Sequence, residues 1–252
     1  MSKKQKLQVV GSADEHKAMA GKNFSVHHLV SFKAMTERQQ EFINAFYESE
    51  TPIIVQYGSA GSGKTATALY AALHHVFDKS TVYDKVVIIR SAVQAREIGF
   101  LKGDEDEKDA VYEAPYDALL NELTTFKSTA YANLKAQHIV EFHNTSFLRG
   151  KTFNNAIMIL DEFENCTYHE LATVITRMGY NTRLVMCGDH KQVDLHKRSD
   201  KTGFFKLLRI LRRMDPDRAK LIKYVPEDCV RSGIAKDFLL AEEEDALEHG
   251  DD

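Results

Sequence analysis

The sequence contains no long apolar run, no secretory signal core and no closely spaced pair of cysteines. A membrane-spanning helix needs roughly 18 consecutive apolar residues, so we expect no membrane contact. The basic start of the chain, MSKKQKLQVV, is not followed by the apolar core of a signal peptide. Cys166, Cys187 and Cys229 form no C-x-x-C motif, and we expect them to be reduced and mostly buried in a cytoplasmic protein.

An excess of charge of one sign is also lacking. The chain carries 33 basic and 37 acidic residues, a net charge of -4, so it is not basic as a whole. A local basic patch is enough to bind nucleic acid, and this class of function therefore stays open. With 43% hydrophobic residues, and with neither an internal repeat nor a linker, the sequence predicts one sizeable soluble domain.

Short apolar segments alternate with amphipathic helices along the chain. This order is typical of a mainly parallel sheet with helices on both faces, so we predict the α/β class with three α/β/α layers. The predicted strands are 52–58, 86–89, 138–143, 156–161, 183–188 and 220–225. The predicted helices are 36–48, 64–77, 116–126, 168–178, 202–213 and 230–240.

Three polar stretches are expected to lie outside the packed core. Residues 1–30 predict a partly ordered N-terminal arm. Residues 242–252 contain seven acidic side chains and predict a disordered tail. The acidic segment 104–117 is expected to be a solvated loop. Residues 31–241 then form a single domain.

The octapeptide GSAGSGKT, from Gly58 to Thr65, matches the phosphate-loop pattern G-x-x-x-x-G-K-[ST]. It follows a predicted strand and opens a predicted helix, which is the context that the pattern requires. Glycines let backbone N–H groups surround phosphate oxygens, and the helix N-terminus adds partial positive charge. We expect Lys64 to reach the β- and γ-phosphates of ATP and Thr65 to bind Mg²⁺. The other predicted nucleotide contacts are Gly58, Ser59, Ala60, Gly61, Ser62 and Gly63 of the loop, Thr67 in the helix after it, and Asp189 further along the chain.

Two carboxylates, Asp161 and Glu162, follow an apolar strand. A buried acidic strand end is costly unless a cation lies beside it, so Asp161 is the predicted partner of Mg²⁺. Glu162 is predicted to polarise the water that attacks the γ-phosphate. The pair favours hydrolysis over phosphoryl transfer to an acceptor. The alternative is a solvated strand end.

The segment VMCGDHKQVDL ends another strand in a polar cluster. Ligands of open α/β sheets bind at the carboxyl ends of the strands, so Gln192 is predicted to lie near the γ-phosphate and to sense ATP or ADP. Asp189 is predicted to hold this loop in position. A surface turn is the plain alternative. A metal site made by the side chains at 190, 194 and 196 is disfavoured, because nothing in the sequence supports its geometry.

The phosphate loop, the Asp-Glu strand and the GD-x-x-Q strand end resemble, in this order, the motor core of superfamily 1 helicases. Within that set the sequence most resembles the PhoH family of P-loop ATPases of bacteria and phages. The resemblance covers about residues 30–240, through TERQQEFINAF, RSAVQAREIGFLKGD, FLRGKTF, ITRMG and EDCVRSGIAKDF. It implies a RecA-like fold, ATP hydrolysis, a bacterial or host cytosol, and a role for Gln39 in reading adenine.

The sequence departs from the family pattern at four serines. Ser59 and Ser62 replace the usual Pro and Thr of the phosphate loop, which we expect to be harmless. Ser91 replaces a Pro, and Ser232 replaces a His. The PIN nuclease domain that some relatives carry is not found in this sequence, so the resemblance does not carry their ribonuclease activity over to this chain.

The resemblance also implies a site shared between protein copies. Superfamily 1 helicases bind ATP between two motor domains, and this chain is long enough for one. We therefore expect a homo-oligomer, such as a hexameric ring, in which a neighbouring copy supplies an arginine to the γ-phosphate. Arg231 and Arg177 are the candidates, and a surface position is the alternative for each.

A basic loop, Arg149 to Thr152, is the candidate contact for single-stranded RNA or DNA, with RNA favoured. Its candidate residues are Arg149, Lys151 and Thr152, and the flanking Phe147 and Phe153 are expected to be core residues rather than stacking platforms. Two other classes of function share the phosphate loop. A small-molecule kinase needs an acceptor pocket and leaves Gln192 unexplained. A nucleotide-switched binding module does not need Glu162 for turnover.

Overall fold

A six-stranded parallel sheet forms the centre of the computed structural model, which describes residues 24–91, 105–189, 191 and 202–249. The strand order is β3-β2-β4-β5-β1-β6, and every neighbouring pair is parallel. The strands are β1 (Ile53–Gly58), β2 (Lys85–Arg90), β3 (Val140–Asn144), β4 (Ala156–Asp161), β5 (Thr182–Gly188) and β6 (Ala219–Tyr224). The predicted α/β class is confirmed.

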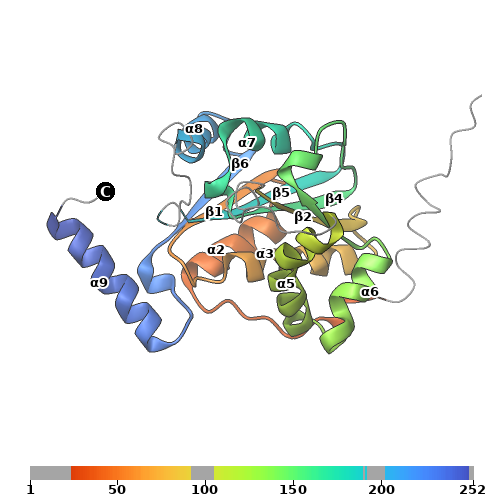
Figure 1. The fold of residues 1–252 in the computed structure, drawn as a ribbon, viewed down its shortest axis with the longest axis horizontal. Helices are drawn as coiled ribbons and strands as arrows, with labels where there is room; N and C mark the ends of the chain where they lie inside the picture. Colours follow the sequence, from red (N-terminus) through yellow and green to blue (C-terminus); the bar gives the residue numbers. More distant parts are fainter. Residues whose placement is uncertain (1–23, 92–104, 190, 192–201, 250–252) are drawn as a thin grey trace, which may run out of the picture.

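Helices cover both faces of the sheet, which gives the three expected layers (Figure 1). One face carries α2 (Glu37–Glu48), α3 (Lys64–Phe77), α5 (Glu105–Leu123) and α6 (Ala130–Ala136). The other face carries α7 (Tyr168–Ile175) and α8 (Thr202–Leu211). The short 3-10 helices are η1 (Val26–His28), η2 (Lys127–Thr129), η3 (Thr145–Phe147), η4 (Phe163–Asn165) and η6 (Pro226–Asp228).

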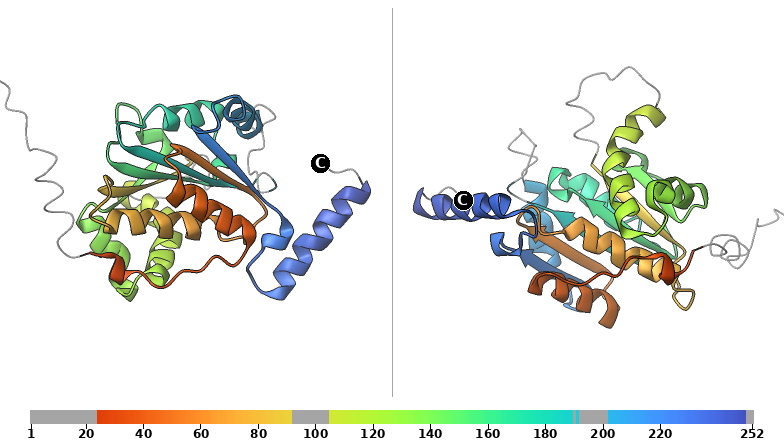
Figure 2. Two further views of the ribbon diagram at one scale, coloured as in Figure 1. Left: turned by 180° about the vertical axis from the view of Figure 1, so that it is seen from behind. Right: turned by 90° about the horizontal axis from the view of Figure 1, so that it is seen from below.

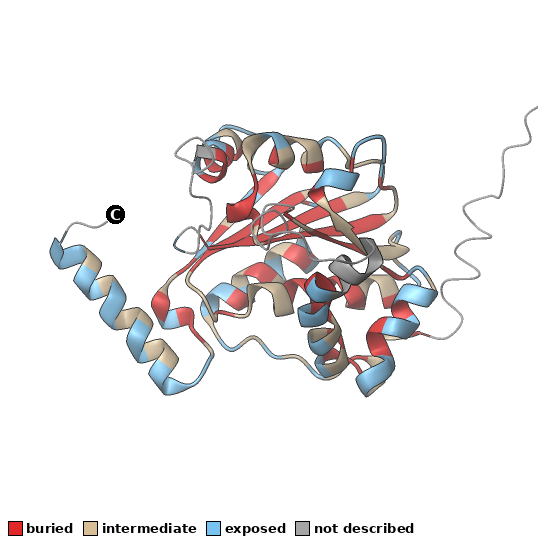
Figure 3. Ribbon diagram, viewed as in Figure 1, coloured by how far each residue is buried: buried red, intermediate tan, exposed pale blue. Residues whose placement is uncertain are grey.

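The central strands are buried on both faces, as Figure 3 shows by their colour. Every residue of β1 and β4 is buried. Ile54 of β1 faces the α2/α3 side, while its neighbour Val55 faces the α7/α8 side. A parallel sheet covered on both faces therefore explains why these strands are apolar throughout rather than alternating.

The acidic segment that was expected to be a loop is helical from residue 105 onwards, and that prediction was wrong. Tyr112, Tyr116, Leu120 and Leu123 recur at helical spacing in α5 and are buried. Their burial outweighs the acidic composition and Pro115, which lies inside the helix. The sequence analysis also missed α6, whose seven residues are anchored by Ala130 and Leu134.

The two ends of the chain were predicted to be a partly ordered arm and a disordered tail. Phe24 and Leu29 are buried, and the Val30 N–H donates to the Leu123 carbonyl at 3.0 Å, so residues 24–30 pack against the domain. Residues 1–23 lie outside the described residues. The last helix, α9 (Gly233–His249), continues through most of the segment expected to be a disordered tail. It stands away from the sheet in both views of Figure 2.

The carboxyl ends of β1, β5 and β4 lie side by side and define one edge of the sheet. In the register, Tyr57 pairs with Gly188, and Asp161 pairs with Cys187. The phosphate loop, the Asp-Glu pair and the Gly-Asp strand end therefore meet at this edge. No helix in the described part of the chain is both long and apolar enough to span a membrane.

Candidate active site

The phosphate loop leaves β1 through Gly58, whose φ of +113° is accessible only to glycine without strain. A Cβ at this position would lie 2.1 Å from the Tyr224 carbonyl oxygen of β6. The same oxygen accepts a hydrogen bond from the Ser59 N–H at 3.2 Å. The loop is thus shaped against β6 before it turns into α3.

Lys64 opens α3 and folds back over the loop. Its Nζ donates to the carbonyl oxygens of Gly58 at 2.9 Å and Ser59 at 2.6 Å, and lies 3.1 Å from Ser62 Oγ. Burial lowers the pKa of Lys64, against the opposing field of Asp189 and other acidic groups. A partly desolvated ammonium held at the loop is placed to meet the charge of a phosphate.

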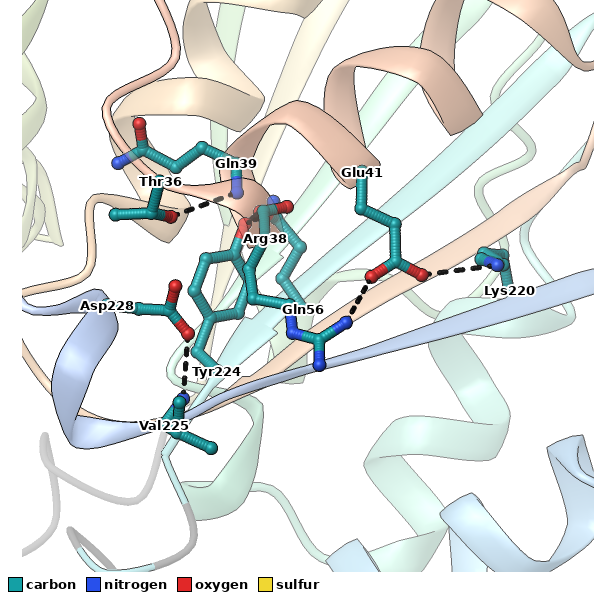
Figure 4. A network of polar contacts seen from close by, with 9 residues as sticks. All are labelled: Thr36, Arg38, Gln39, Glu41, Gln56, Lys220, Tyr224, Val225 and Asp228. Atoms are coloured by element: carbon teal, nitrogen blue, oxygen red, sulfur yellow. Dashed lines mark hydrogen bonds and ion pairs between the residues drawn. The ribbon is translucent and has the colours of Figure 1, made fainter.

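A buried polar network supports the loop from beneath, between α2 and β6 (Figure 4). Gln56 Oε1 accepts hydrogen bonds from the Tyr224 hydroxyl at 2.6 Å and from Thr67 Oγ1 at 3.3 Å. Gln56 Nε2 donates to the Lys64 carbonyl at 3.2 Å. Thr67 is fully buried in this network, so it supports the loop rather than facing a ligand as the sequence analysis expected.

Gln39 also supports the loop. Thr36 caps α2 by accepting a hydrogen bond from the Gln39 N–H at 3.2 Å (Figure 4). The buried Gln39 side chain accepts from the Met35 N–H at 2.8 Å and donates to the Ser62 carbonyl at 2.9 Å. These contacts tie the start of α2 to the loop, whereas adenine recognition by Gln39 stays a prediction.

Asp161 ends β4 directly opposite the start of α3. Its Oδ1 accepts a hydrogen bond from Thr65 Oγ1 at 2.8 Å, and its Oδ2 accepts one from the Tyr116 hydroxyl at 2.9 Å. Burial raises the pKa of Asp161, although both hydrogen bonds oppose this effect. The phosphate loop and the Asp-Glu strand are therefore joined by a direct contact.

A hydroxyl and a carboxylate are hard oxygen ligands of the kind that Mg²⁺ prefers. Thr65 and Asp161 thus fit the predicted metal site. Among the described residues, no group of three or more His, Cys, Asp or Glu is arranged to hold a metal ion.

Glu162 follows Asp161 with a left-handed backbone, at a φ of 50°. Arg90, at the end of β2, contacts the Glu162 carboxylate through two nitrogens. Nε lies 3.1 Å from Oε2, and a second nitrogen forms a short ion pair with Oε1. The guanidinium also lies 5.9 Å from the centre of the Tyr112 ring. Both carboxylate oxygens of Glu162 are thus engaged by Arg90.

A third carboxyl group, Glu164, lies beneath the end of β5. Burial raises the pKa of Glu164 to about 8, although the Asp189 N–H hydrogen-bonds the carboxylate. Asp189 is itself buried, and its Oδ1 accepts a hydrogen bond from the Lys191 N–H at 3.1 Å, while its role in holding this loop stays a prediction. Gln192 and the disfavoured metal set of residues 190, 194 and 196 lie outside the described residues.

The two candidate arginines lie at opposite edges of the sheet. The Arg231 side chain contacts the phosphate loop of its own chain, because a Cβ at Gly61 would lie 3.0 Å from Arg231 Cδ. The adjacent Val230 N–H donates to the Gly61 carbonyl at 3.0 Å. Arg177 precedes β5, and its carbonyl accepts from the N–H of Phe153 at 3.0 Å, before β4. Arg177 is therefore at the amino edge, away from the phosphate loop of the same chain.

The candidate nucleic-acid residues lie on the surface. Arg149 is 3.0 Å from His169 Nε2, and Lys151 Nζ is 3.2 Å from His143 Nδ1. Thr152 is exposed beside them. Arg177 joins this group through a 3.4 Å contact with the Lys151 carbonyl.

The two flanking aromatics differ from each other. Phe153 is buried in the core, as expected, but Phe147 is 51% exposed, against expectation.

Sequence reasoning did not assign roles to Arg90, Tyr116 or Gln56. Arg90 ends an apolar strand beside β4, so the argument used for Asp161 would also have found Arg90. Gln56 interrupts an apolar strand, which is itself a signal because a buried amide needs partners. Tyr116 opens the helix predicted over 116–126, but nothing in the sequence marks its contact with Asp161.

The chain is similar to known proteins over most of its length. A family model described as "PhoH-like protein" matches residues 31–243. Protein PhoH of Escherichia coli (strain K12) is 33% identical over 211 residues, which cover 82% of this chain and 57% of that protein. The PhoH-like protein of Bacillus subtilis (strain 168) is 34% identical over 169 residues, which cover 66% of this chain and 51% of that protein. The chain spans about half the length of the curated relatives it matches.

A large terminase from a thermophilic bacteriophage shares 10% sequence identity with the chain, with a TM-score of 0.48. That alignment covers 81% of this chain and 49% of the terminase. The match to the PhoH family model covers the phosphate loop, the Asp-Glu pair and the segment around Arg231. The chain therefore belongs to the PhoH family.

Proposed function

We propose that this protein hydrolyses ATP with Mg²⁺ and couples hydrolysis to single-stranded nucleic acid, with RNA favoured, as a helicase-like motor. The observation that carries the proposal is the 2.8 Å hydrogen bond between Thr65 Oγ1 and Asp161 Oδ1. It joins the phosphate loop to the strand that bears Glu162. Bound Mg²⁺ would be held by Thr65 and Asp161 and would neutralise phosphate charge.

Each charged residue has a task in this proposal. Lys64 meets the β- and γ-phosphates from the loop that it opens. Glu162 accepts the proton of the attacking water, for which its carboxylate must first leave Arg90. Gln192 reports the γ-phosphate to the rest of the chain. Cys166, Cys187 and Cys229 are free and buried, which supports a reducing compartment such as the cytosol.

The support for nucleic acid is a basic group made by the exposed Arg149 and Lys151 and the half-buried Arg177, with the exposed Phe147 near them in the sequence. Cations that contact phosphates provide affinity without sequence preference, and an exposed ring gives a base a stacking surface. The placement of Arg177 in this group favours a nucleic-acid role over its predicted role at the γ-phosphate. If phosphate contacts dominate, the affinity for nucleic acid is expected to fall steeply as the salt concentration rises.

A homo-oligomer, such as a hexameric ring, is part of the proposal. Arg231 lies beside the phosphate loop of its own chain, so the proposed shared site requires it to reach a neighbour as well. Mixing Arg231→Ala protein with Lys64→Ala protein tests this. Activity regained at some mixing ratio is expected if Arg231 acts between copies. If no ratio restores activity, Arg231 acts within its own chain.

The central experiment measures phosphate release from ATP with and without poly(U) and single-stranded DNA, at several salt concentrations. Wild type is expected to release phosphate with Mg²⁺ and to respond to the polymer. Lys64→Ala is expected to abolish turnover, and Glu162→Gln is expected to abolish turnover while ATP still binds. Phosphate moved to a small acceptor would instead identify a kinase. Function that survives Glu162→Gln would identify a nucleotide-switched module.

A further inference from the structure

Helix α5 approaches the Asp-Glu pair from the α2/α3 side of the sheet and presents two tyrosines one turn apart. Tyr116 donates its hydroxyl proton to Asp161 Oδ2 at 2.9 Å. Tyr112 lies over the Arg90 guanidinium, which in turn holds Glu162. Helix α5 therefore contacts Asp161 directly and Glu162 indirectly, through Arg90.

The Tyr116 ring is fixed by packing. Tyr116 is 2% exposed and belongs to the core formed by α3, α5 and the sheet. Its ring lies 5.9 Å from that of Phe142 on β3. This packing holds the Tyr116 hydroxyl against Asp161 Oδ2, to which it donates.

The two carboxylate oxygens of Asp161 accept hydrogen bonds from different partners. Tyr116 occupies Oδ2, and Thr65 lies at Oδ1, on the phosphate-loop side. Holding one oxygen fixes the rotation of the carboxylate about its χ2 axis. Oδ1 is then held toward Thr65 in the orientation that a cation shared with Thr65 requires.

We propose that Tyr116 is a positioning residue for Mg²⁺, acting through Asp161, and that α5 is the supporting element of the Asp161–Glu162 pair. The inference rests on the proposed nucleotide site. Partners behind a metal ligand orient it, and their removal typically weakens metal affinity roughly 10- to 100-fold. Tyr116 needs no contact with nucleotide or water to have this effect.

The test compares Tyr116→Phe with wild type in the binding of a fluorescent ADP, titrated with Mg²⁺ and repeated in EDTA. The variant keeps the buried ring and loses only the hydroxyl. We expect the Mg²⁺ concentration for half-maximal binding to rise roughly 10-fold or more. Affinity in EDTA is expected to stay unchanged, since Lys64 and the loop are intact. In ATP hydrolysis, excess Mg²⁺ is expected to restore kcat.

Tyr70→Phe is the matched control, because Tyr70 is a partly buried tyrosine whose ring stacks on Phe32. This control should leave the Mg²⁺ dependence unchanged. An unchanged Mg²⁺ dependence in Tyr116→Phe would overturn the positioning role, as would an equal loss of ADP affinity in EDTA. Thermal unfolding of both variants shows whether the protein is folded in each assay.

The same titration separates this inference from the proposed function. Wild type that binds no nucleotide would overturn both. Wild type that binds ADP with Mg²⁺ but does not hydrolyse ATP would overturn the proposed hydrolysis and leave the Mg²⁺ titration of Tyr116→Phe as the test of the inference.

Discussion

Gly58 is the residue at which the shape of the phosphate loop depends most directly on a neighbouring strand. Its φ of +113° and the 2.1 Å approach of the Tyr224 carbonyl oxygen to a hypothetical Cβ are two separate obstacles to any side chain. The neighbouring atom is backbone within a parallel strand pair, so it cannot move aside without breaking the pairing of β1 with β6.

Gly58→Ala is therefore expected to destabilise the fold by about 3 kcal/mol or more and to abolish nucleotide binding. Gly150→Ala is the matched control. Its φ is +81°, but a Cβ there meets no atom within 4 Å, so a cost of only about 1–2 kcal/mol is expected. Urea unfolding of both variants measures the difference. An equal loss of unfolding free energy in both variants would show that backbone strain alone causes the loss and that the contact with β6 does not contribute.

Arg90 holds the residue that the proposed reaction needs free. Arg90→Ala is expected to raise ATP hydrolysis in the absence of nucleic acid roughly fivefold, which corresponds to about 1 kcal/mol for a lost charge-assisted contact. Glu162 keeps 34% of its side chain exposed, so water can solvate the released carboxylate. Steady-state phosphate release measures the effect.

The control for Arg90 is Arg38→Ala, which removes an ion pair with Glu41 at 2.8 Å on the exposed surface of α2. This variant should hydrolyse ATP as wild type does. A fall in rate for Arg90→Ala, to the level of Glu162→Gln, would mean that Arg90 orients Glu162 for catalysis and does not restrain it.

Strand β3 is an edge strand that pairs with β2, and one carboxylate links the two strands. Glu141 on β3 accepts from Lys85 Nζ at 2.7 Å and lies 3.2 Å from His143 Nε2. Burial opposes ionisation, but the contacts with His143 and Lys85 outweigh it and lower the pKa of Glu141 from 4.5 to about 2. A depressed folded-state pKa means that the stabilisation is present above about pH 4.5 and is lost as the pH falls toward 2.

Glu141→Gln is thus expected to lower the free energy of unfolding at pH 7 by about 1–2 kcal/mol. The full shift would correspond to roughly 3 kcal/mol, reduced here because the side chain is partly exposed. Urea unfolding of variant and wild type between pH 7 and pH 3 gives the difference at each pH. The difference should shrink as the pH falls. A constant difference would assign the effect to packing and not to charge.

Helices and strands whose apolar residues follow a clear sequence pattern were predictable, and those held mainly by tertiary contacts were not. Helix α3 and strand β4 have the predicted bounds, because the phosphate loop marks where α3 begins and the acidic pair marks where β4 ends. The same reasoning brought Thr65 and Asp161 together, because parallel strands share a carboxyl edge.

Only the second half of α5, from residue 116, was predicted, because four acidic residues at its start hide a buried face that only its neighbours reveal. The hydrogen bond from Tyr116 to Asp161 depends on this packing and was not predicted. The Arg231 contact with Gly61 depends on how the chain returns after β6, which no local pattern encodes.

Helix α9 gives the molecule a projecting arm that begins just after the contact of Val230 with Gly61. No residue of α9 is buried, and Ile234 and Phe238 are 78% and 65% exposed. Its acidic side chains are opposite in sign to the exposed Lys206 and Arg209 of α8. These features favour a second copy of the chain as the partner of α9, next to the phosphate loop.

The double variant Ile234→Ser with Phe238→Ser is expected to shift the protein toward monomer without lowering its unfolding temperature, because neither side chain packs in the core. Val82→Ser, at another exposed apolar position of 48% exposure, is the control. Sedimentation velocity at matched concentrations measures the assembly. An unchanged distribution of species would exclude α9 as the contact between copies.

The pairing of β1 with β6 also has a consequence for protein synthesis. The Tyr224 hydroxyl and Gln56 meet across 168 residues of sequence, and the Tyr224 carbonyl shapes the loop that follows Gly58. During synthesis β1 leaves the ribosome early and β6 leaves it among the last elements. The phosphate loop therefore cannot reach its final shape until nearly the whole domain has been made. A chain that stops before residue 224 leaves β1 with an unpaired edge, which is prone to aggregate. Completion of the loop thus coincides with completion of the sheet.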